Sequence, residues 1–105
     1  MRVLIKAKMP TDQANRLVRE GKLGATIRAI TQELKPEAAY FYEESGQRTG
    51  IFVADLPDSS HIPRIAEPFF LALGAHLEAM HPAMSPDDLA KADRDLQQAA
   101  QKYAA

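Results

Sequence analysis

Residues 38–56, AAYFYEESGQRTGIFVADL, decide the fold of this 105-residue chain. Two runs of apolar and aromatic residues flank the pair Ser45-Gly46, and the residues next to this pair are polar. Apolar runs on either side of a glycine-containing turn are typical of a β-hairpin. We therefore predict two antiparallel strands here, and their register decides which side chains share a face.

Two registers of this hairpin compete. A two-residue turn would place Phe41 opposite Gly50 and Tyr40 opposite Ile51, which mixes the two faces. A loop one residue longer, with glycine in the left-handed conformation of a bulge, would place Phe41 opposite Ile51 and Tyr40 opposite Phe52. Because the second register keeps like side chains together, we predict it.

Hydrophobic periodicity and turn residues place the other elements around the hairpin. Alternation of apolar and polar residues indicates a strand, whereas apolar residues three or four apart indicate a helix. Glycines and prolines mark breaks and ends. The predicted elements are a strand over residues 2–9, a helical stretch over 11–34 broken near Gly21 and Gly24, the hairpin, a helix over 58–73 bent at Pro68, a strand over 76–80 and a C-terminal helix over 85–104.

The order of these elements predicts the fold class. The order β-α-β-β-α-β is that of ferredoxin-like α+β sandwiches, here with an additional C-terminal helix. A chain of this length suits one domain, so we predict a single domain over residues 1–105. The predicted sheet order is 4-1-3-2, which makes the first and last strands neighbours.

Composition excludes several kinds of partner and chemistry. Lys and Arg number 13 against 14 Asp and Glu, so the chain has no excess of positive charge for binding nucleic acid. There is no cysteine, which excludes disulfides and thiolate chemistry. No apolar run approaches the length of a membrane span, and the N-terminus has no signal-peptide core. We expect a cytoplasmic protein that binds neither nucleic acid nor membranes.

The hairpin stretch, together with IPRIAEPFF and the later HPAMSPDDLAK, resembles a known superfamily, the dimeric α+β barrels. It is also similar to a family of short, uncharacterised bacterial proteins of that architecture. The resemblance implies two ferredoxin-like subunits whose open sheet faces lie against each other. Members of the superfamily include cofactor-free monooxygenases, muconolactone-isomerase-like enzymes, haem-degrading enzymes and stress-responsive proteins. None of their catalytic motifs matches this chain residue by residue, so the resemblance informs fold and assembly.

Strand parity predicts which side chains lie on the open face, the face of the sheet that no helix of the same copy covers. The residues predicted to face the helices are Val3, Ile5, Ala7, Phe41, Ile51, Val53, Leu77 and Ala79. Those predicted on the open face are Leu4, Lys6, Lys8, Tyr40, Tyr42, Phe52, Ala54, His76, Glu78 and Met80. An apolar patch of this size is unusual on a soluble monomer, so we expect a homodimer.

Candidate site residues come from this predicted open face. The catalytic candidates are His76, Glu78 and Lys6, since imidazole, carboxylate and amine groups can transfer protons when burial shifts their pKa values. An ordinary cross-strand ion pair between Lys6 and Glu78 is the leading alternative. His76 and Glu78 could also ligate a metal, but no third ligand is in phase, so no metal or other cofactor is predicted.

The candidates for ligand contact are the larger side chains of the same face. They are Tyr40, Tyr42, Phe52 and Met80. For each of them packing is the more ordinary role, because aromatic residues commonly fill interfaces and methionine fills irregular gaps.

Three functions remain open. The leading hypothesis is a homodimer that binds a small apolar or aromatic molecule in a cavity between facing sheets. The second is a cofactor-independent enzyme, monooxygenase- or isomerase-like, that acts on a small aromatic or carbonyl compound. In that enzyme His76 or Glu78 would be the base, and Tyr40, Tyr42 or Lys6 would stabilise negative charge. The third is a purely structural or regulatory dimer module.

Overall fold

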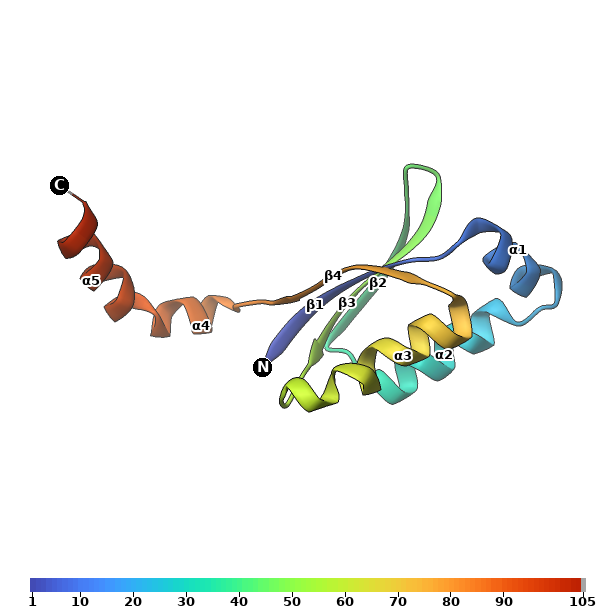
Figure 1. The fold of residues 1–105 in the computed structure, drawn as a ribbon, viewed down its shortest axis with the longest axis horizontal. Helices are drawn as coiled ribbons and strands as arrows, with labels where there is room; N and C mark the ends of the chain where they lie inside the picture. The colour runs from blue at the N-terminus through green and yellow to red at the C-terminus, as the bar shows by residue number, and fades with distance from the viewer. Residues whose placement is uncertain (105) are drawn as a thin grey trace.

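The computed structural model describes residues 1–104 and shows an α+β fold, as predicted (Figure 1). A four-stranded sheet carries helices on one face, and a helical segment at the C-terminus extends away from it. The elements are β1 (Arg2–Lys8), α1 (Thr11–Arg19), α2 (Leu23–Leu34), β2 (Ala38–Glu44), β3 (Gln47–Asp55), a short 3-10 helix (Ser59–His61), α3 (Ile62–Leu73), β4 (His76–Pro82), α4 (Pro86–Lys91) and α5 (Asp93–Tyr103).

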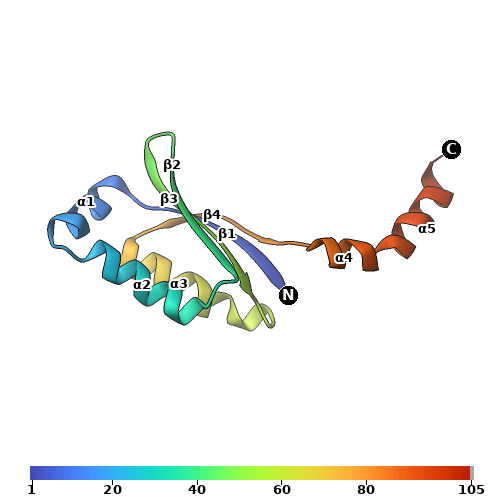
Figure 2. The same cartoon turned by 180° about the vertical axis from the view of Figure 1, so that it is seen from behind.

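The strands pair antiparallel throughout, in the order β2-β3-β1-β4. Read from the β4 edge, this order is 4-1-3-2. Both α2 and α3 lie on one side of the sheet, and none of the helices in residues 1–104 lies over the opposite, open face (Figures 1 and 2). The core therefore forms between β1, β3 and α3, with buried side chains that include Ile5, Phe52, Phe69 and Leu73.

The helical stretch after β1 breaks where the two glycines predicted a break. Residue Gly21 has φ +67°, a left-handed conformation that side chains other than glycine rarely adopt. Helix α1 ends at Arg19 and α2 begins at Leu23. The predicted break is thus confirmed, and the stretch forms two separate helices.

The hairpin adopts the register with the two-residue turn, not the predicted one. Ser45 and Gly46 have φ values of +53° and +76°, as a two-residue type I′ turn requires. Phe41 lies opposite Gly50, and the prediction of a longer, bulged loop is wrong. The reason is that Gly50 leaves room for the ring of Phe52, which packs edge-on against Phe41 with centroids 5.6 Å apart.

This register reverses the predicted faces of β3. Phe52 pairs with Ile5 and is only 2% exposed, and Ala54 is buried in the same core. Ile51 and Val53 lie instead opposite Lys6 and Leu4, on the open face. The prediction that Phe52 and Ala54 lie on the open face is therefore wrong.

Strand β4 also departs from simple alternation. The register with β1 shifts between Lys6 and Ala7, so Glu78 has no direct partner and the parity changes after it. Met80 pairs with Ile5 and packs against the core, whereas Ala79 lies opposite Lys6 on the open face. The predictions for Met80 and Ala79 are wrong. Leu77, before the shift, packs against the core as predicted.

The C-terminal segment is two helices rather than the single helix predicted over 85–104. The helix α4 ends at Lys91, and α5 begins at Asp93 after a turn at Ala92. Neither helix contains a buried residue. The molecule is consequently 60 Å long but only 29 by 20 Å across, and we call Pro86–Tyr103 the arm (Figures 1 and 2). Within residues 1–104 no helix has both the length and the apolar character needed to cross a membrane.

Candidate functional site

Four ionisable side chains meet on the open face, and we call them the ion cluster: Lys6, Lys8, Glu44 and Glu78. Lys6 and Lys8 project from the central strand β1, Glu44 comes from β2 and Glu78 from β4. The Glu44 carboxylate lies 2.6 Å from Lys6 Nζ and 3.0 Å from Lys8 Nζ. The Glu78 carboxylate lies 3.4 Å from each of the two Nζ atoms. The ion pair between Lys6 and Glu78 is thus confirmed, as part of a larger cluster.

Contacts within the cluster favour the charged forms of Lys6, Lys8 and Glu44. Hydrogen bonds from Lys6 and then Lys8 lower the pKa of Glu44 to about 2. The hydrogen bond to Glu44 raises the pKa of each lysine above its ordinary value. Burial and a 3.1 Å hydrogen bond to Glu44 raise the pKa of the Tyr42 hydroxyl. At neutral pH these two lysines and Glu44 are charged, so none of them can serve as a proton donor or acceptor of intermediate strength.

The sequence identified part of this cluster and missed the rest. Lys6 and Glu78 are among the predicted candidates, whereas Glu44, beside the hairpin turn, is not. Lys8 has the deepest side chain of the cluster, at 15% exposure, and was not a candidate. Parity was a usable signal, because Lys8 follows Lys6 by two residues on β1 and Glu44 follows Tyr42 by two on β2.

The ligand-contact candidates divide between the two faces. Tyr40 is 70% exposed on β2, and Tyr42 lies two residues further along the same face. Phe52 and Met80 pack toward the core and are removed from the set. Ile51 and Val53, half-buried, take their place beside the tyrosines. These two residues could not be found without the correct hairpin register.

The remaining catalytic candidate, His76, is exposed and pairs with Lys8 in the register of β4 with β1. No hydrogen bond orients its ring within residues 1–104. It lies near the positive charges of the cluster, and no carboxylate orients it as an acid–base catalyst requires. Within the same residues, no three His, Cys, Asp or Glu side chains are grouped to hold a metal ion.

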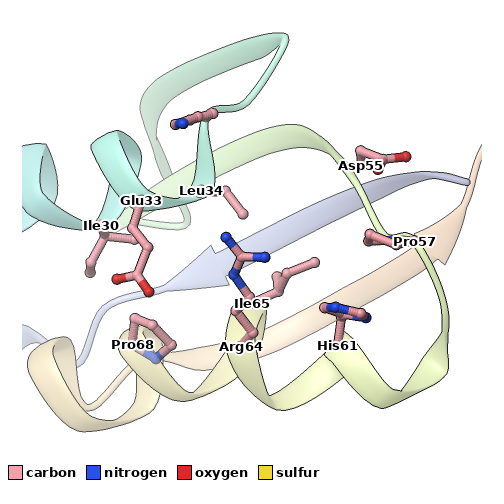
Figure 3. Close-up of a pocket in the computed structure, with 10 residues that line it drawn as sticks. Ile30, Glu33, Leu34, Asp55, Pro57, His61, Arg64, Ile65 and Pro68 are labelled. Carbon is pink, nitrogen blue, oxygen red and sulfur yellow. The ribbon is translucent and has the colours of Figure 1, made fainter.

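A pocket lies on the helical side of the sheet (Figure 3). It has a volume of about 220 Å³ and is bounded by the end of α2, the start of α3 and the segment after β3. Its residues are Ile30, Glu33, Leu34, Lys35, Asp55, Pro57, His61, Arg64, Ile65 and Pro68. Because they come from three separate elements, no local sequence pattern marks this pocket.

The polar groups of this pocket only partly neutralise one another. His61 is 3.2 Å from Asp58, which also accepts the Ser60 backbone N–H, so His61 belongs to the helix-capping region. The hydrogen bonds from Ser60 lower the pKa of Asp58. Glu33 and Arg64 line the same space but form no ion pair within residues 1–104 (Figure 3). The pocket therefore combines apolar walls with ionisable side chains.

No model of a known protein family matches the chain, and a search of curated proteins gives no match. The resemblance to the dimeric α+β barrels consequently remains a prediction, and the function must be argued from the two faces of the sheet.

Proposed function

We propose that two copies of this chain associate through their open sheet faces and hold a small apolar or aromatic molecule between them. The arrangement would be that of the dimeric α+β barrels, with each subunit a ferredoxin-like sandwich. One observation carries the proposal: Leu4, Tyr40, Ile51 and Val53 form an apolar row on a face that no helix in residues 1–104 covers. Rows of this kind on soluble proteins usually mark a binding surface.

The open face favours a second copy as the partner. A twofold interface uses the same patch on both subunits, so one apolar row can cover another. The ion cluster at one end does not oppose this contact, because its two lysines and two glutamates balance each other. Paired charges of this kind resist burial far less than a single uncompensated charge does.

Small residues on the open face would leave space between the sheets. Ala38 lies opposite Val53 and Ala79 lies opposite Lys6, so both interrupt the row of larger side chains. The space would be apolar beside Ile51 and Val53 and polar beside the ion cluster. The ligand that fits it is a small molecule with an aromatic or aliphatic body and a polar group at one end.

Catalysis is favoured less than binding. The raised pKa of Lys6 keeps its amine from acting as an acid or base near neutral pH. The Glu78 carboxylate is already engaged by Lys6 and Lys8. His76 has no oriented partner within the described residues. A filled interface, the structural alternative, would differ from the proposal only in leaving no space for the ligand.

The association is tested by placing a charge on the apolar row. Val53→Asp should convert a micromolar dimer into a monomer in sedimentation velocity, because the carboxylate would be buried without a partner. Val18→Asp is the matched control, since Val18 is half exposed on α1 and away from the open face. A wild-type protein that sediments as a monomer would overturn the proposal.

The same preparation tests the ligand space. We expect an amphiphilic aromatic probe, anilinonaphthalene sulfonate, to fluoresce with the wild-type dimer. Ile51→Trp, which would fill the space, should reduce that signal while the protein stays dimeric. The control is Leu71→Trp on the exposed side of α3. An undiminished signal in Ile51→Trp would leave the dimer without the proposed chamber.

A further inference from the structure

The arm exposes apolar side chains that a monomer leaves uncovered. Leu96 is 55% exposed and Tyr103 is 77% exposed, and α5 contains no buried residue. Isolated helices shorter than about 12–15 residues are marginal in water. The 11 residues of α5 therefore need packing that their own subunit does not supply.

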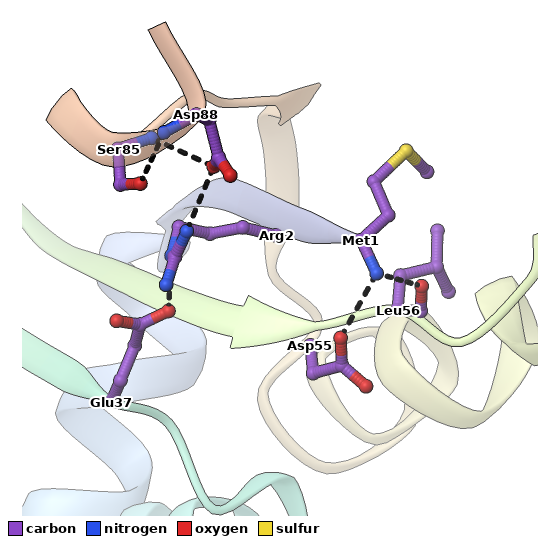
Figure 4. A network of polar contacts seen from close by, with 7 residues as sticks. All are labelled: Met1, Arg2, Glu37, Asp55, Leu56, Ser85 and Asp88. Carbon is purple, nitrogen blue, oxygen red and sulfur yellow. Dashed lines mark hydrogen bonds and ion pairs between the residues drawn. The ribbon is translucent and has the colours of Figure 1, made fainter. Parts of the chain in front are cut away.

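The base of the arm is tied to its own sheet (Figure 4). Ser85 and Asp88 form a reciprocal capping box, with bonds of 3.1 and 3.0 Å, and Asp88 also accepts a 3.1 Å bond from Arg2 at the start of β1. The N–H of Ala83 donates to the Arg2 carbonyl at 3.0 Å. These contacts fix the point at which the arm leaves, and beyond it the helices run away from the body (Figures 1 and 2).

The apolar residues of α5 lie along one side of that helix. Leu96, Ala99 and Tyr103 are separated by three and then four residues. This is the spacing with which a helix presents one apolar face to a partner. The helix α5 is thus suited to lie along an apolar surface.

The sheet face alone is small for a stable interface. Four strands about 4.8 Å apart, each of seven residues at about 3.4 Å, give a footprint of roughly 450 Å². A standard interface buries about 800 Å² on each partner. The two helices of the arm, 6 and 11 residues long and therefore about 9 and 17 Å at 1.5 Å per residue, can supply further area.

From these observations we infer that the two copies exchange arms. The arm of each copy lies along the β2 side of the other copy's open face, with Leu96 and Tyr103 against Tyr40, and closes that side of the ligand chamber. The arm follows β4, which lies at the opposite edge of the sheet from β2. The Tyr40 of the same copy therefore lies on the far edge from the start of the arm. Because a twofold axis repeats every contact, the exchange covers the apolar side chains of both arms at the same time. The inference rests on the proposed dimer and adds the segment that completes it.

Cross-linking tests the exchange directly, since the chain has no cysteine of its own. Leu96→Cys chains are mixed with Tyr40→Cys chains, allowed to exchange subunits and oxidised. We expect a covalent heterodimer on a non-reducing gel. Arg94→Cys, on the polar side of α5, is the matched control and should give at most a trace. A product that joins only Leu96→Cys chains to each other would overturn the inference, because the arms would then pair with one another.

Affinity separates this inference from the proposed dimer. In the full-length protein Leu96→Asp should raise the dimer dissociation constant about tenfold or more, the effect of losing one well-packed interface residue. Arg94→Asp should leave it unchanged. At protein concentrations low enough for both variants to be monomeric, thermal unfolding of the body should be the same in both, because α5 has no buried residue within its own copy. If Val53→Asp dissociates the dimer but Leu96→Asp does not weaken it, the dimer stands and the arm exchange is refuted.

Discussion

Replacing Gly50 by alanine should destabilise the protein, although alanine is the better residue in a strand. A Cβ atom at position 50 would lie 2.9 Å from Cε2 of Phe52 and 3.4 Å from Cδ1 of Phe41. The Phe52 ring cannot retreat easily, because its centroid is 5.1 Å from that of Phe69 on its other side. Overpacking of this kind costs about 1–3 kcal/mol, against a gain of about 0.5–1 kcal/mol from removing glycine from a strand. We expect Gly50→Ala to lower the free energy of unfolding by about 1–2 kcal/mol.

Urea denaturation followed by circular dichroism measures this change, and Gly24→Ala is its control. A Cβ at Gly24 would meet only the end of the Arg28 side chain, at 3.3 Å, and that side chain can move. Gly24→Ala should therefore leave stability unchanged or raise it by up to about 1 kcal/mol. In a thermal melt each kcal/mol lost corresponds to about 4–8 °C for a domain near this size.

The sign of the result decides the hairpin register. In the longer-loop register Gly50 would lie opposite Tyr42 on the open face, where a methyl group is tolerated and the variant gains stability. A Gly50→Ala protein at least as stable as the wild type would therefore refute the observed packing. The double variant Gly50→Ala/Phe52→Leu should lose less free energy of unfolding than the two single variants lose in sum. The smaller side chain at position 52 relieves the contact with the new methyl group.

The other predictions concern the ion cluster and the arm. The pKa of Glu44 is about 2 against an ordinary 4.5, so its contribution to stability is complete above pH 4.5 and is lost as the pH falls toward 2. Glu44→Gln should flatten the rise of stability between those two pH values, measured as the urea midpoint, whereas Glu43→Gln should not. Ser85→Ala removes the capping box and should cost α4 about 1 kcal/mol, seen as faster amide exchange over residues 86–91 with an unchanged melt of the body. If amide hydrogen exchange in α4 stays at the wild-type rate, the capping box does not hold the start of the arm.

Local patterns predicted the elements of this fold, and they failed where a single residue sets the phase. The break near Gly21 and the strand β1 follow from backbone preference and periodicity. The hairpin register does not follow from these signals. We predicted it by pairing like residues across the strands, and that rule ignores the space that a glycine leaves for a neighbouring side chain. At Gly50 the missing side chain is the packing feature, and it admits the Phe52 ring.

The candidate site was predictable to the extent that strand parity holds. Lys6 and Tyr40 lie on the open face as predicted because β1 and β2 alternate without interruption. Phe52 and Met80 were misplaced because a turn type and a bulge each shift the alternation by one residue. The pocket between α2 and α3 depends on how helices pack in three dimensions, and no periodic signal encodes it.

The ion cluster limits what the open face can bind. Lys6 and Lys8 stand between two carboxylates, so a second sheet laid over them would bury no net charge. The charged groups still lose water on burial, and this loss is smallest if a polar group or ordered water remains beside them. The apolar row near Val53, by contrast, favours contact with apolar groups and the exclusion of water. A ligand between two such faces would therefore lie with its polar end toward the Lys8 end of the sheet and its apolar body toward Val53, and the exchanged arms would shield the apolar end.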